Sequence, residues 1–349
     1  MKIKNYIFKD SEIVSKIIKT MRGFVVLVNN QNNVTGVFTE GDFRNAVLKG
    51  VKLNQRISKI MNKNFKFVTP VSSIKKIGNI FDKTIVQKIL VLKKKQLTSI
   101  IDRDDFYKSA TIKRKKINLE NPVVIIAGGE GRRLLPFTEI LPKGLIPVGG
   151  VPIVKKIMDE FSKNDFNNFN LVINFKGKVF QAYFHENKSN YKIKFHTEKK
   201  PLGTAGYLVN FTNNFNKPVF VTNCDILLKA NYRDILNFHT KNKNDLTLCA
   251  SFKNFMIPYG VFEVDKKSNL KSIREKPEYN LLVNTGFYIF DPKVFKYIPK
   301  NEYFNMNLLI QKLKKLKKKI GVFPVSNNSW LDVGQWDEYK KTVEILKKN

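Results

Sequence analysis

Residues 123–138 read VVIIAGGEGRRLLPFT, an apolar run followed by a glycine-rich segment. Five consecutive apolar residues are typical of a parallel strand that is buried on both faces of a sheet. Glycines directly after such a strand let backbone N–H groups approach a phosphate chain closely. The segment therefore predicts an α/β domain with an anion-binding loop at the carboxyl end of its first strand.

Apolar runs that follow this segment predict the remaining strands of the same sheet. They are Leu171–Phe175, Ile193–His196, Val219–Thr222 and Leu246–Ser251, and helical patterns lie between most of them. This alternation predicts a doubly wound α/β fold. Residues 259–290 are richer in strand patterns, which we interpret as an inserted small mixed sheet. A helix over residues 336–346 completes the predicted domain.

Two known phosphate-binding templates do not fit the glycine-rich segment. A P-loop requires G-x-x-x-x-G-K-[ST], which the segment lacks. A dinucleotide-binding loop requires a third glycine, and Leu134 occupies that position. A run of glycines with two cations, Arg133 and Lys143, remains in one loop system. It predicts a site for a polyphosphate.

Residues 127–138, with Pro142 and Lys143 after them, resemble the motif of the sugar-1-phosphate nucleotidyltransferase family. That motif is G-G-x-G-[TS]-R-L-x-P-x-T followed by P-K. Arg132 replaces its Thr or Ser, and Gly144 replaces a common Pro. The resemblance extends over residues 122–349. The loop residues for which it implies nucleotide contacts are Ala127, Gly128, Gly129, Gly131, Arg133 and Lys143.

Further segments match other motifs of this family in order. Residues 198–206 correspond to its base-recognition loop, which implies nucleotide contacts for Glu198, Gly203 and Thr204. Asp225, at the end of a strand, and Asp332 are the implied ligands of Mg²⁺, a hard cation that takes carboxylate oxygens. The implied sugar-binding residues are Tyr259, Gly260, Glu275, Asn284 and Thr285.

The implied reaction is the attack of a sugar-1-phosphate oxygen on the α-phosphorus of a nucleoside triphosphate, with loss of pyrophosphate. Because two anions must meet, the reaction needs cations rather than a general base. The implied catalytic residues are Arg133, Lys143, Asp225, Lys276 and Asp332. Two structural alternatives stay open: Asp332 as a helix cap, and Lys276 with Glu275 as an exposed ion pair.

The N-terminal third has a different pattern. A charged segment before Pro122, residues 113–121, is typical of an exposed linker. Residues 1–112 contain two copies of helix, strand, turn, strand and helix, a repeat that resembles a pair of CBS domains. The resemblance implies an adenine nucleotide at Thr39 and Asp42, or a role in forming a homo-oligomer. Alternatively, these two residues only cap a helix.

The combination of the two modules resembles bacterial guanylyltransferases that form GDP-sugars. It is most similar to the CBS-containing glucosamine-1-phosphate guanylyltransferases of legionaminic acid biosynthesis. The resemblance implies GTP as donor and a hexosamine or hexose 1-phosphate as acceptor. Mannose- or heptose-1-phosphate guanylyltransferases, enzymes that use UTP, CTP or dTTP, and an inactive nucleotide sensor stay open, because no spacing identifies the base.

The composition limits the classes of binding partner that we expect. The net charge of +34 divides into +17 in residues 1–120 and +17 in residues 121–349, which indicates a chain-wide bias rather than a nucleic-acid-binding tail. No apolar run reaches the ~18 residues that span a bilayer, and the N-terminus lacks the apolar core of a secretory signal. Two cysteines cannot form a disulfide framework. We therefore expect a cytoplasmic protein without nucleic-acid or membrane partners.

Overall fold

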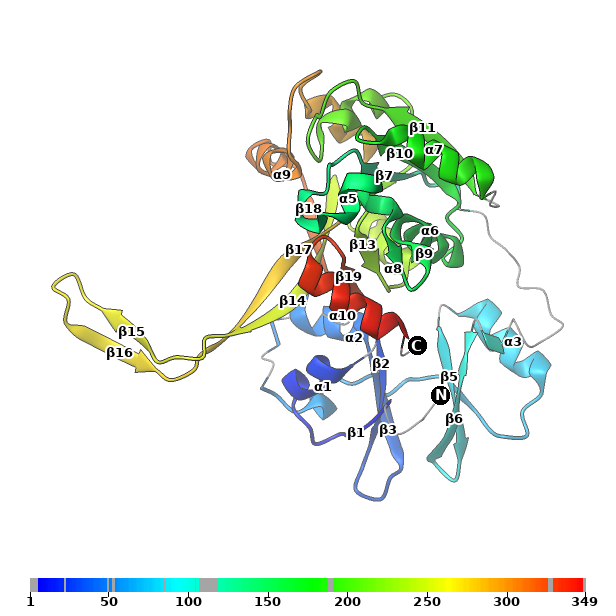
Figure 1. Cartoon of the computed structure of the whole chain (residues 1–349). Coiled ribbons are helices and arrows are strands. Elements are labelled where there is room, and N and C mark those ends of the chain that lie inside the picture. Colours follow the sequence, from blue (N-terminus) through cyan, green and yellow to red (C-terminus); the bar gives the residue numbers. More distant parts are fainter. Residues whose placement is uncertain are drawn as a thin grey trace. The chain divides into compact units, whose positions relative to one another are not determined.

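The computed structural model describes residues 6–21, 23–48, 50–51, 54–84, 86–103, 105–106, 119–187, 191–325 and 329–347. The chain divides into two compact units, Met1–Ile117 and Asn118–Asn349, which run from blue to cyan and from green to red in Figure 1. The predicted linker includes this division, but its residues 113–118 lie outside the described residues. None of the described helices is long and apolar enough to cross a membrane.

The second unit is built on one seven-stranded sheet, in the order β11-β10-β7-β12-β17-β14-β18. The strands are β7 (Val123–Ala127), β10 (Asn168–Ile173), β11 (Lys192–Thr197), β12 (Val219–Asn223), β14 (Leu246–Met256), β17 (Glu278–Phe290) and β18 (Ile320–Val325). All predicted strands are confirmed. Of these seven strands only β17 is reversed, because it returns from β14 through a hairpin.

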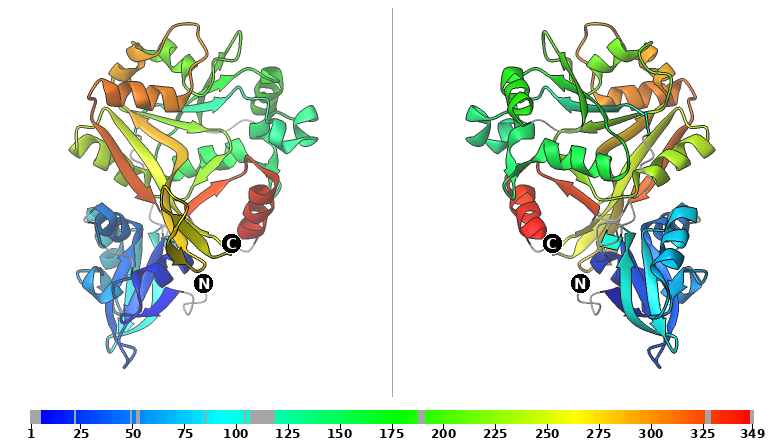
Figure 2. Two further views of the ribbon diagram at one scale, coloured as in Figure 1. Left: turned by 90° about the vertical axis from the view of Figure 1, so that its left-hand side faces the viewer. Right: turned by 90° about the vertical axis from the view of Figure 1, so that its right-hand side faces the viewer.

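Both faces of the sheet are covered by helices, as Figure 2 shows. One face packs on α6 (Ile153–Lys163), α7 (Gly177–Glu186) and α8 (Tyr232–Lys241). The other packs on η5 (Gly206–Phe211), η6 (Pro292–Tyr297) and α9 (Met306–Lys315). Within β7, Val123 and Ile125 belong to the first core and Val124 to the second. The continuous apolar run is therefore explained by burial on both faces, as predicted.

Short elements surround the carboxyl ends of β7 and β12. They are η3 (Arg132–Leu134), α5 (Phe137–Ile140), η4 (Lys143–Leu145), β8 (Pro147–Val148), β9 (Val151–Pro152), β13 (Ile226–Leu228), β19 (Trp330–Asp332) and α10 (Trp336–Lys347). Helix α10 confirms the predicted closing helix. It holds the loop after η3 in place, since Trp336 Nε1 donates to the carbonyl of Leu135 at 3.0 Å and its ring packs on Phe137.

The prediction of a small mixed sheet over residues 259–290 is wrong. Strands β14 and β17 stay paired in antiparallel register as far as Met256 and Glu278, well past the other strands of the sheet. Beyond them, β15 (Val261–Val264) and β16 (Leu270–Arg274) pair only with each other. The strand pattern belongs to one long antiparallel hairpin, which projects from the second unit in Figure 1. We call residues 252–282 the arm.

The first unit confirms the internal repeat. Its elements are β1 (Ile7–Lys9), α1 (Val14–Thr20), β2 (Phe24–Val28), β3 (Val34–Thr39), α2 (Glu40–Leu48), η2 (Ile57–Lys59), β4 (Phe67–Val68), α3 (Ile74–Lys83), β5 (Lys88–Lys93) and β6 (Gln96–Asp102). Each half forms a three-stranded sheet from one short parallel strand and one hairpin. The short strands β1 and β4 were not predicted. They have three and two residues, which are too few to show an alternating pattern. The closing helix expected from Asp104 lies largely outside the described residues.

Candidate functional site

The glycine-rich loop begins at Ala127, the buried last residue of β7. A Cβ atom at Gly128 would press on the Glu198 carboxylate and lie 3.2 Å from Asn174 Cβ. Gly131 adopts a φ of +70°, and a Cβ there would lie 2.8 Å from Thr138 Cγ2. A side chain at Gly131 would therefore be strained, and one at Gly128 would displace the Glu198 carboxylate. Gly129 has open space around it, so the loop is free on the side where a phosphate chain would approach.

The two arginines of the loop differ in their contacts. Arg132 Nε pairs with Glu130 Oε2 at 2.6 Å, so this departure from the family motif has a local partner. Arg133 is exposed, and among the described residues we find no hydrogen bond or ion pair to its side chain. Its guanidinium is thus available to an incoming phosphate.

A cluster of two carboxylates and one ammonium lies at the carboxyl edge of the sheet. Asp225 follows β12, and Asp332 ends β19, which pairs with β13 so that Ile226 lies opposite Asp332. The Lys143 ammonium forms an ion pair with Asp225. The backbone N–H of Gly334 donates to Asp332 Oδ1 at 2.7 Å. The structure therefore brings together three of the five predicted catalytic residues.

The electrostatics of this cluster show an excess of negative charge. Burial raises the pKa of Asp332, and the neighbouring Asp225 raises it further. Burial alone would lower the pKa of Lys143, but the carboxylates outweigh this effect and the pKa is raised. Two carboxylates that share one ammonium leave room for a further cation.

The donor set fits Mg²⁺. The described residues contain no group of three or more His, Cys, Asp and Glu side chains that could enclose a metal. Asp225, directly before β13, and Asp332, at the end of the paired strand β19, offer carboxylate oxygens. Mg²⁺ is commonly held by one or two carboxylates, with water and substrate phosphates as the other ligands. The pair would serve such an ion, with the remaining positions left to phosphate.

Gly334 is a site residue that sequence reasoning did not single out. A Cβ atom there would lie 2.5 Å from Asp225 Oδ2, 3.0 Å from Asp332 Oδ1 and 3.1 Å from Lys143 Nζ. Its lack of a side chain is what lets the three charged groups converge. The only signal in the sequence is its place two residues after Asp332.

Glu198 is the most unusual carboxyl group of the loop region. Its residue is 6% exposed, and its Oε1 has no hydrogen-bond partner among the described residues. Burial raises its pKa to about 7, and a backbone hydrogen bond with Leu202 offsets this only in part. A buried acceptor without a partner is costly unless a ligand supplies the donor. The Glu198 carboxylate lies beside Gly128, which places it at the glycine-rich loop.

Gly203 and Thr204, also predicted to bind the nucleotide, have structural contacts. Gly203 adopts a φ of +77°, and a Cβ there would lie 2.9 Å from the carbonyl oxygen of Phe304. The hydroxyl of Thr204 accepts a hydrogen bond from the N–H of Met306 at 2.8 Å, and so caps the start of α9. The described contacts of these two residues attach the predicted base-recognition loop to α9.

The predicted sugar-binding residues fall into two groups. Asn284 and Thr285 lie on β17 beside the site edge, where the adjacent Gly286 packs against Asn223. The Thr285 hydroxyl donates to the carbonyl of Cys249 at 2.8 Å, and Asn284 Nδ2 donates to the hydroxyl of Tyr288 at 2.8 Å.

The other group lies on the arm. It comprises Tyr259, Gly260 and Glu275, and the predicted catalytic residue Lys276 follows directly. Lys276 Nζ lies 4.0 Å from Glu275 Oε1, and both side chains are exposed, as the ion-pair alternative anticipates. Thr285 follows Lys276 by nine positions, which corresponds to about 30 Å of extended strand. In this conformation the arm residues are therefore apart from the carboxylate cluster.

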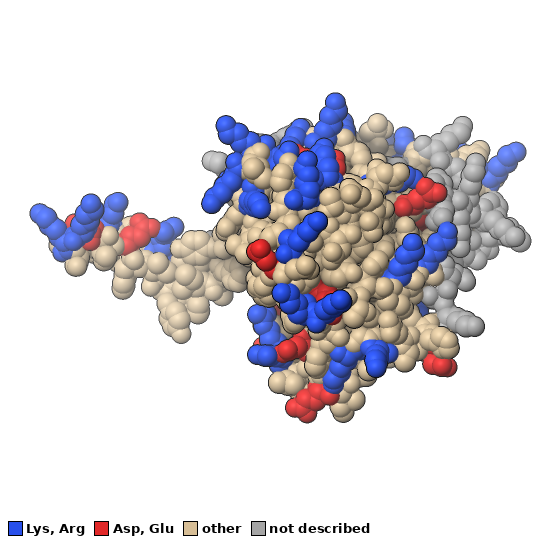
Figure 3. Space-filling model, turned by 90° about the horizontal axis from the view of Figure 1, so that it is seen from above, with Lys and Arg blue, Asp and Glu red and all other residues tan. Residues whose placement is uncertain are grey.

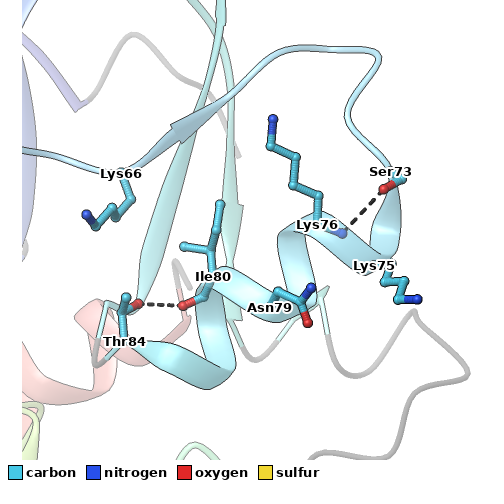
Figure 4. Close-up of a pocket in the computed structure, with 7 residues that line it drawn as sticks. All are labelled: Lys66, Ser73, Lys75, Lys76, Asn79, Ile80 and Thr84. Carbon is cyan, nitrogen blue, oxygen red and sulfur yellow. Dashed lines mark hydrogen bonds between the residues drawn. The ribbon is translucent and has the colours of Figure 1, made fainter.

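In the first unit, Thr39 and Asp42 bond to each other at the start of α2. The Thr39 hydroxyl donates to Asp42 Oδ2 at 2.7 Å, and the N–H of Asp42 donates to the Thr39 hydroxyl at 3.2 Å. These contacts are those of a helix cap, the alternative left open by the sequence. A separate pocket of about 500 Å³ lies along α3 in the second half of the repeat. Figure 4 shows its three lysines, Lys66, Lys75 and Lys76.

Comparison with known proteins agrees with this geometry. The family model described as nucleotidyl transferase matches residues 122–349. The chain belongs to this family. A relative named bifunctional protein GlmU, from Methanococcus aeolicus, is 32% identical over 64% of this chain and 54% of its own length. The mannose-1-phosphate guanyltransferase of Pichia angusta is 29% identical over 61% and 60%. The chain thus spans little more than half the length of these two relatives.

A third relative is matched over nearly its whole length. The D-glycero-alpha-D-manno-heptose 1-phosphate guanylyltransferase of Campylobacter jejuni is 26% identical over 62% of this chain and 96% of its own. The crystal structure of HddC from Yersinia pseudotuberculosis has a TM-score of 0.53 and 24% identity, and covers 65% of this chain and 99% of that one. This likeness supports the fold described for the second unit. Each of these four matches covers about two thirds of this chain or less.

Proposed function

We propose that the protein is a Mg²⁺-dependent sugar-1-phosphate nucleotidyltransferase. The observation that carries the proposal is the convergence of Lys143, Asp225 and Asp332 at the sheet edge beside the glycine-rich loop. Cations and metal-binding carboxylates next to a phosphate-binding loop suit the transfer of a nucleotidyl group between two phosphates. Membership of the nucleotidyl transferase family supports the same reaction.

The chain's own residues would act mainly by holding charge in place. The loop around Gly129 and Gly131 would hold the triphosphate through backbone N–H groups. Arg133, whose side chain has no partner among the described residues, would contact the pyrophosphate that leaves. Lys143 would move from Asp225 to the α-phosphate, and Asp225 and Asp332 would hold Mg²⁺. When bound, that ion neutralises the charge that develops on the phosphates.

Guanine as the base is supported by Glu198. The Watson–Crick edge of guanine presents two adjacent donors, N1–H and the N2 amino group, and a carboxylate can accept both. Glu198 has an unpartnered oxygen beside the loop. Two of the relatives carry guanyl- or guanylyltransferase names, and an HddC structure is titled as a complex with GMP-PN. GTP is therefore the donor that we propose.

For the acceptor we propose glucosamine 1-phosphate, which gives GDP-glucosamine for surface glycan or nonulosonic acid synthesis. The support is the resemblance to CBS-containing guanylyltransferases together with the repeat of the first unit. That unit would bind AMP or ATP near Thr39 and Asp42, or pair two chains. Calorimetry of the full chain with AMP, using Thr39→Val as the control, tests the nucleotide site. Equal heat from both proteins would contradict the assignment.

A substrate panel tests the enzymatic proposal. Purified protein is incubated with each of four nucleoside triphosphates and with glucosamine, mannose, heptose and glucose 1-phosphates, with and without Mg²⁺, and pyrophosphate release is measured. We expect the highest kcat/KM for GTP with glucosamine 1-phosphate, and no turnover after chelation of the metal. Preference for another base or sugar would overturn the substrate assignment alone. Absence of turnover with every pair would overturn the catalytic proposal.

A further inference from the structure

The second unit carries a dense group of lysines, which we call the basic patch. It consists of the nine lysines of residues 293–300 and 312–319, three in the first segment and six in the second. Glu302 is the one acidic residue between positions 293 and 319, so this stretch has about three times the chain's average net charge per residue. Figure 3 shows Lys and Arg gathered over the side of the second unit that carries α9 in Figure 1. A chain-wide bias predicts no such local concentration.

Most lysines of the basic patch lack a carboxylate partner. Lys293 pairs with Asp245 and Asp291, but we find no ion pair for the other eight among the described residues. Seven of these eight side chains are exposed, and Lys318 is half-buried. Like charges that lie this close together repel one another. An external anion with many charges would therefore be attracted to this surface.

Helix α9 presents part of this charge together with apolar side chains. Its inner face is buried in the core of the second unit through Met306, Leu309 and Leu313. On the outer face, Leu308 is followed by Lys312 and Lys315 at helical spacing. Leu308, and Leu316 directly after the helix, are each 45% exposed. A face that combines lysines with exposed apolar side chains is typical of helices that lie on a membrane surface.

The basic patch and the candidate site lie at opposite edges of the sheet. Residues 312–319 precede β18, which runs parallel to β14 from its first residue. Residues 293–300 follow β17, whose last residue, Phe290, lies opposite Val219 at the start of β12. Asp225 follows the other end of β12. The lysines of the patch are therefore remote from the phosphates of the proposed reaction, and a large anion on the patch leaves the site edge open.

The charge of the chain itself argues against an internal partner. Residues 1–120 carry +17, so neither the first unit nor a second copy supplies the missing negative charge. A nucleic acid supplies it, but single strands also need aromatic rings on which bases stack. The ammonium groups of Lys296 and Lys318 both lie 5.4 Å from the ring centre of Tyr297, so lysines already occupy this ring. The exposed leucines instead suit the apolar layer beneath lipid head groups.

We propose that the basic patch docks the protein on an anionic lipid surface. Its lysines contact the lipid phosphates, and Leu308 and Leu316 enter the head-group layer. A cluster of about four to eight basic residues is sufficient for such binding. The proposal replaces our expectation of no membrane partner, which rested on the charge of each half of the chain and on the lack of a spanning segment. A surface contact requires no spanning segment, and this one does not rest on the proposed function.

Cosedimentation of the full chain with lipid vesicles tests the docking. Vesicles of phosphatidylcholine with about 30% phosphatidylglycerol are compared with pure phosphatidylcholine vesicles at about 150 mM NaCl. We expect binding to the anionic vesicles alone, and weaker binding as the salt concentration rises. The triple variant Lys312→Gln, Lys315→Gln, Lys319→Gln should lower the partition coefficient roughly 100-fold, at about fivefold per lysine. Leu308→Ser combined with Leu316→Ser should lower it about tenfold.

The matched control changes three exposed lysines at the tip of the arm, Lys266→Gln, Lys267→Gln and Lys271→Gln. This variant has the same net charge as the patch variant and should bind within about twofold of wild type. Equal losses in the two triple variants, equal binding to both kinds of vesicle, or unchanged binding of the leucine variant would overturn the proposal. An oligonucleotide that binds wild type more tightly than the vesicles do, and fails to bind the patch variant, would assign the patch to nucleic acid instead. None of these results depends on turnover.

Discussion

The sheet edge and the arm both carry predicted site residues, but they hold them in different ways. At the edge, the Lys143 and Asp225 side chains are 22% and 10% exposed and contact each other. On the arm, Lys276 and Glu275 are 62% and 71% exposed, with each other as partners. Buried charges in mutual contact keep their positions before substrate arrives. The residues proposed for the phosphate chemistry are therefore organised within a single chain, whereas the proposed sugar-binding residues of the arm depend on where the arm is placed.

The largest effect on activity is expected from a substitution at the sheet edge. Asp225→Asn keeps the shape of the side chain but removes the charge that faces Lys143, so we expect kcat/KM to fall about 10³-fold. Asp337→Asn, an exposed carboxyl in the first turn of α10, is the matched control. Pyrophosphate release measures the loss, and thermal unfolding checks that the fold persists. Unchanged turnover in Asp225→Asn would remove Asp225 from the metal site.

The next effect distinguishes an arm that serves its own chain from one that serves a partner. Asp225→Asn disables the edge and Lys276→Ala disables the arm, and we expect each variant alone to be nearly inactive. If arms act in the partner's site, an equal mixture regains about a quarter of wild-type activity, because random pairing leaves one intact site in half of the dimers.

The measurement is turnover after the two proteins are mixed, dissociated and reassociated. The doubly substituted chain, mixed with wild type in the same way, is the control for exchange. No recovery in a mixture that sedimentation shows to be dimeric would mean that each arm closes over its own sheet edge. The arm would then have two positions in a single chain, one extended and one closed over the sheet edge.

Much of the sheet edge could be predicted because its signals are local. The continuous apolar run of β7 predicts its burial on both faces of the sheet. The glycine at position 131 indicates a backbone conformation that other residues rarely adopt. The convergence of Lys143 with Asp225 and Asp332 was not visible, since it depends on the pairing of β13 with β19 across about a hundred residues. The order of the motifs in the sequence suggested these residues as catalytic, but only the register of β13 with β19 brings the two carboxylates together.

The arm was misread because strand patterns do not reveal partners. Alternation in residues 259–290 fits either a sheet or a long hairpin, and only the pairing of β15 with β16 alone distinguishes them. Likewise, the sequence shows that Glu198 precedes a loop, but not that burial leaves one of its oxygens without a donor.

The smallest expected effect concerns Glu198, which belongs to the edge but lacks a partner there. Burial raises its folded-state pKa from 4.5 to about 7, so the folded protein holds more protons than the unfolded chain between these values. The free energy of unfolding should therefore fall as the pH rises from 4.5 to 7 and level off above. Glu198→Gln should remove this fall, which thermal unfolding across that pH range measures without any substrate.

Binding of guanine adds an opposite dependence on pH. The ionised carboxylate accepts both guanine donors, whereas the protonated form offers a donor of its own, so the KM for GTP should rise up to tenfold per pH unit below about 7. In Glu198→Gln the KM should be about tenfold higher at pH 8 and independent of pH. Sugar-1-phosphate KM values in both proteins serve as the control. A variant with unchanged GTP preference, yet with the altered unfolding profile, would leave Glu198 as a buried carboxyl without a role in base recognition.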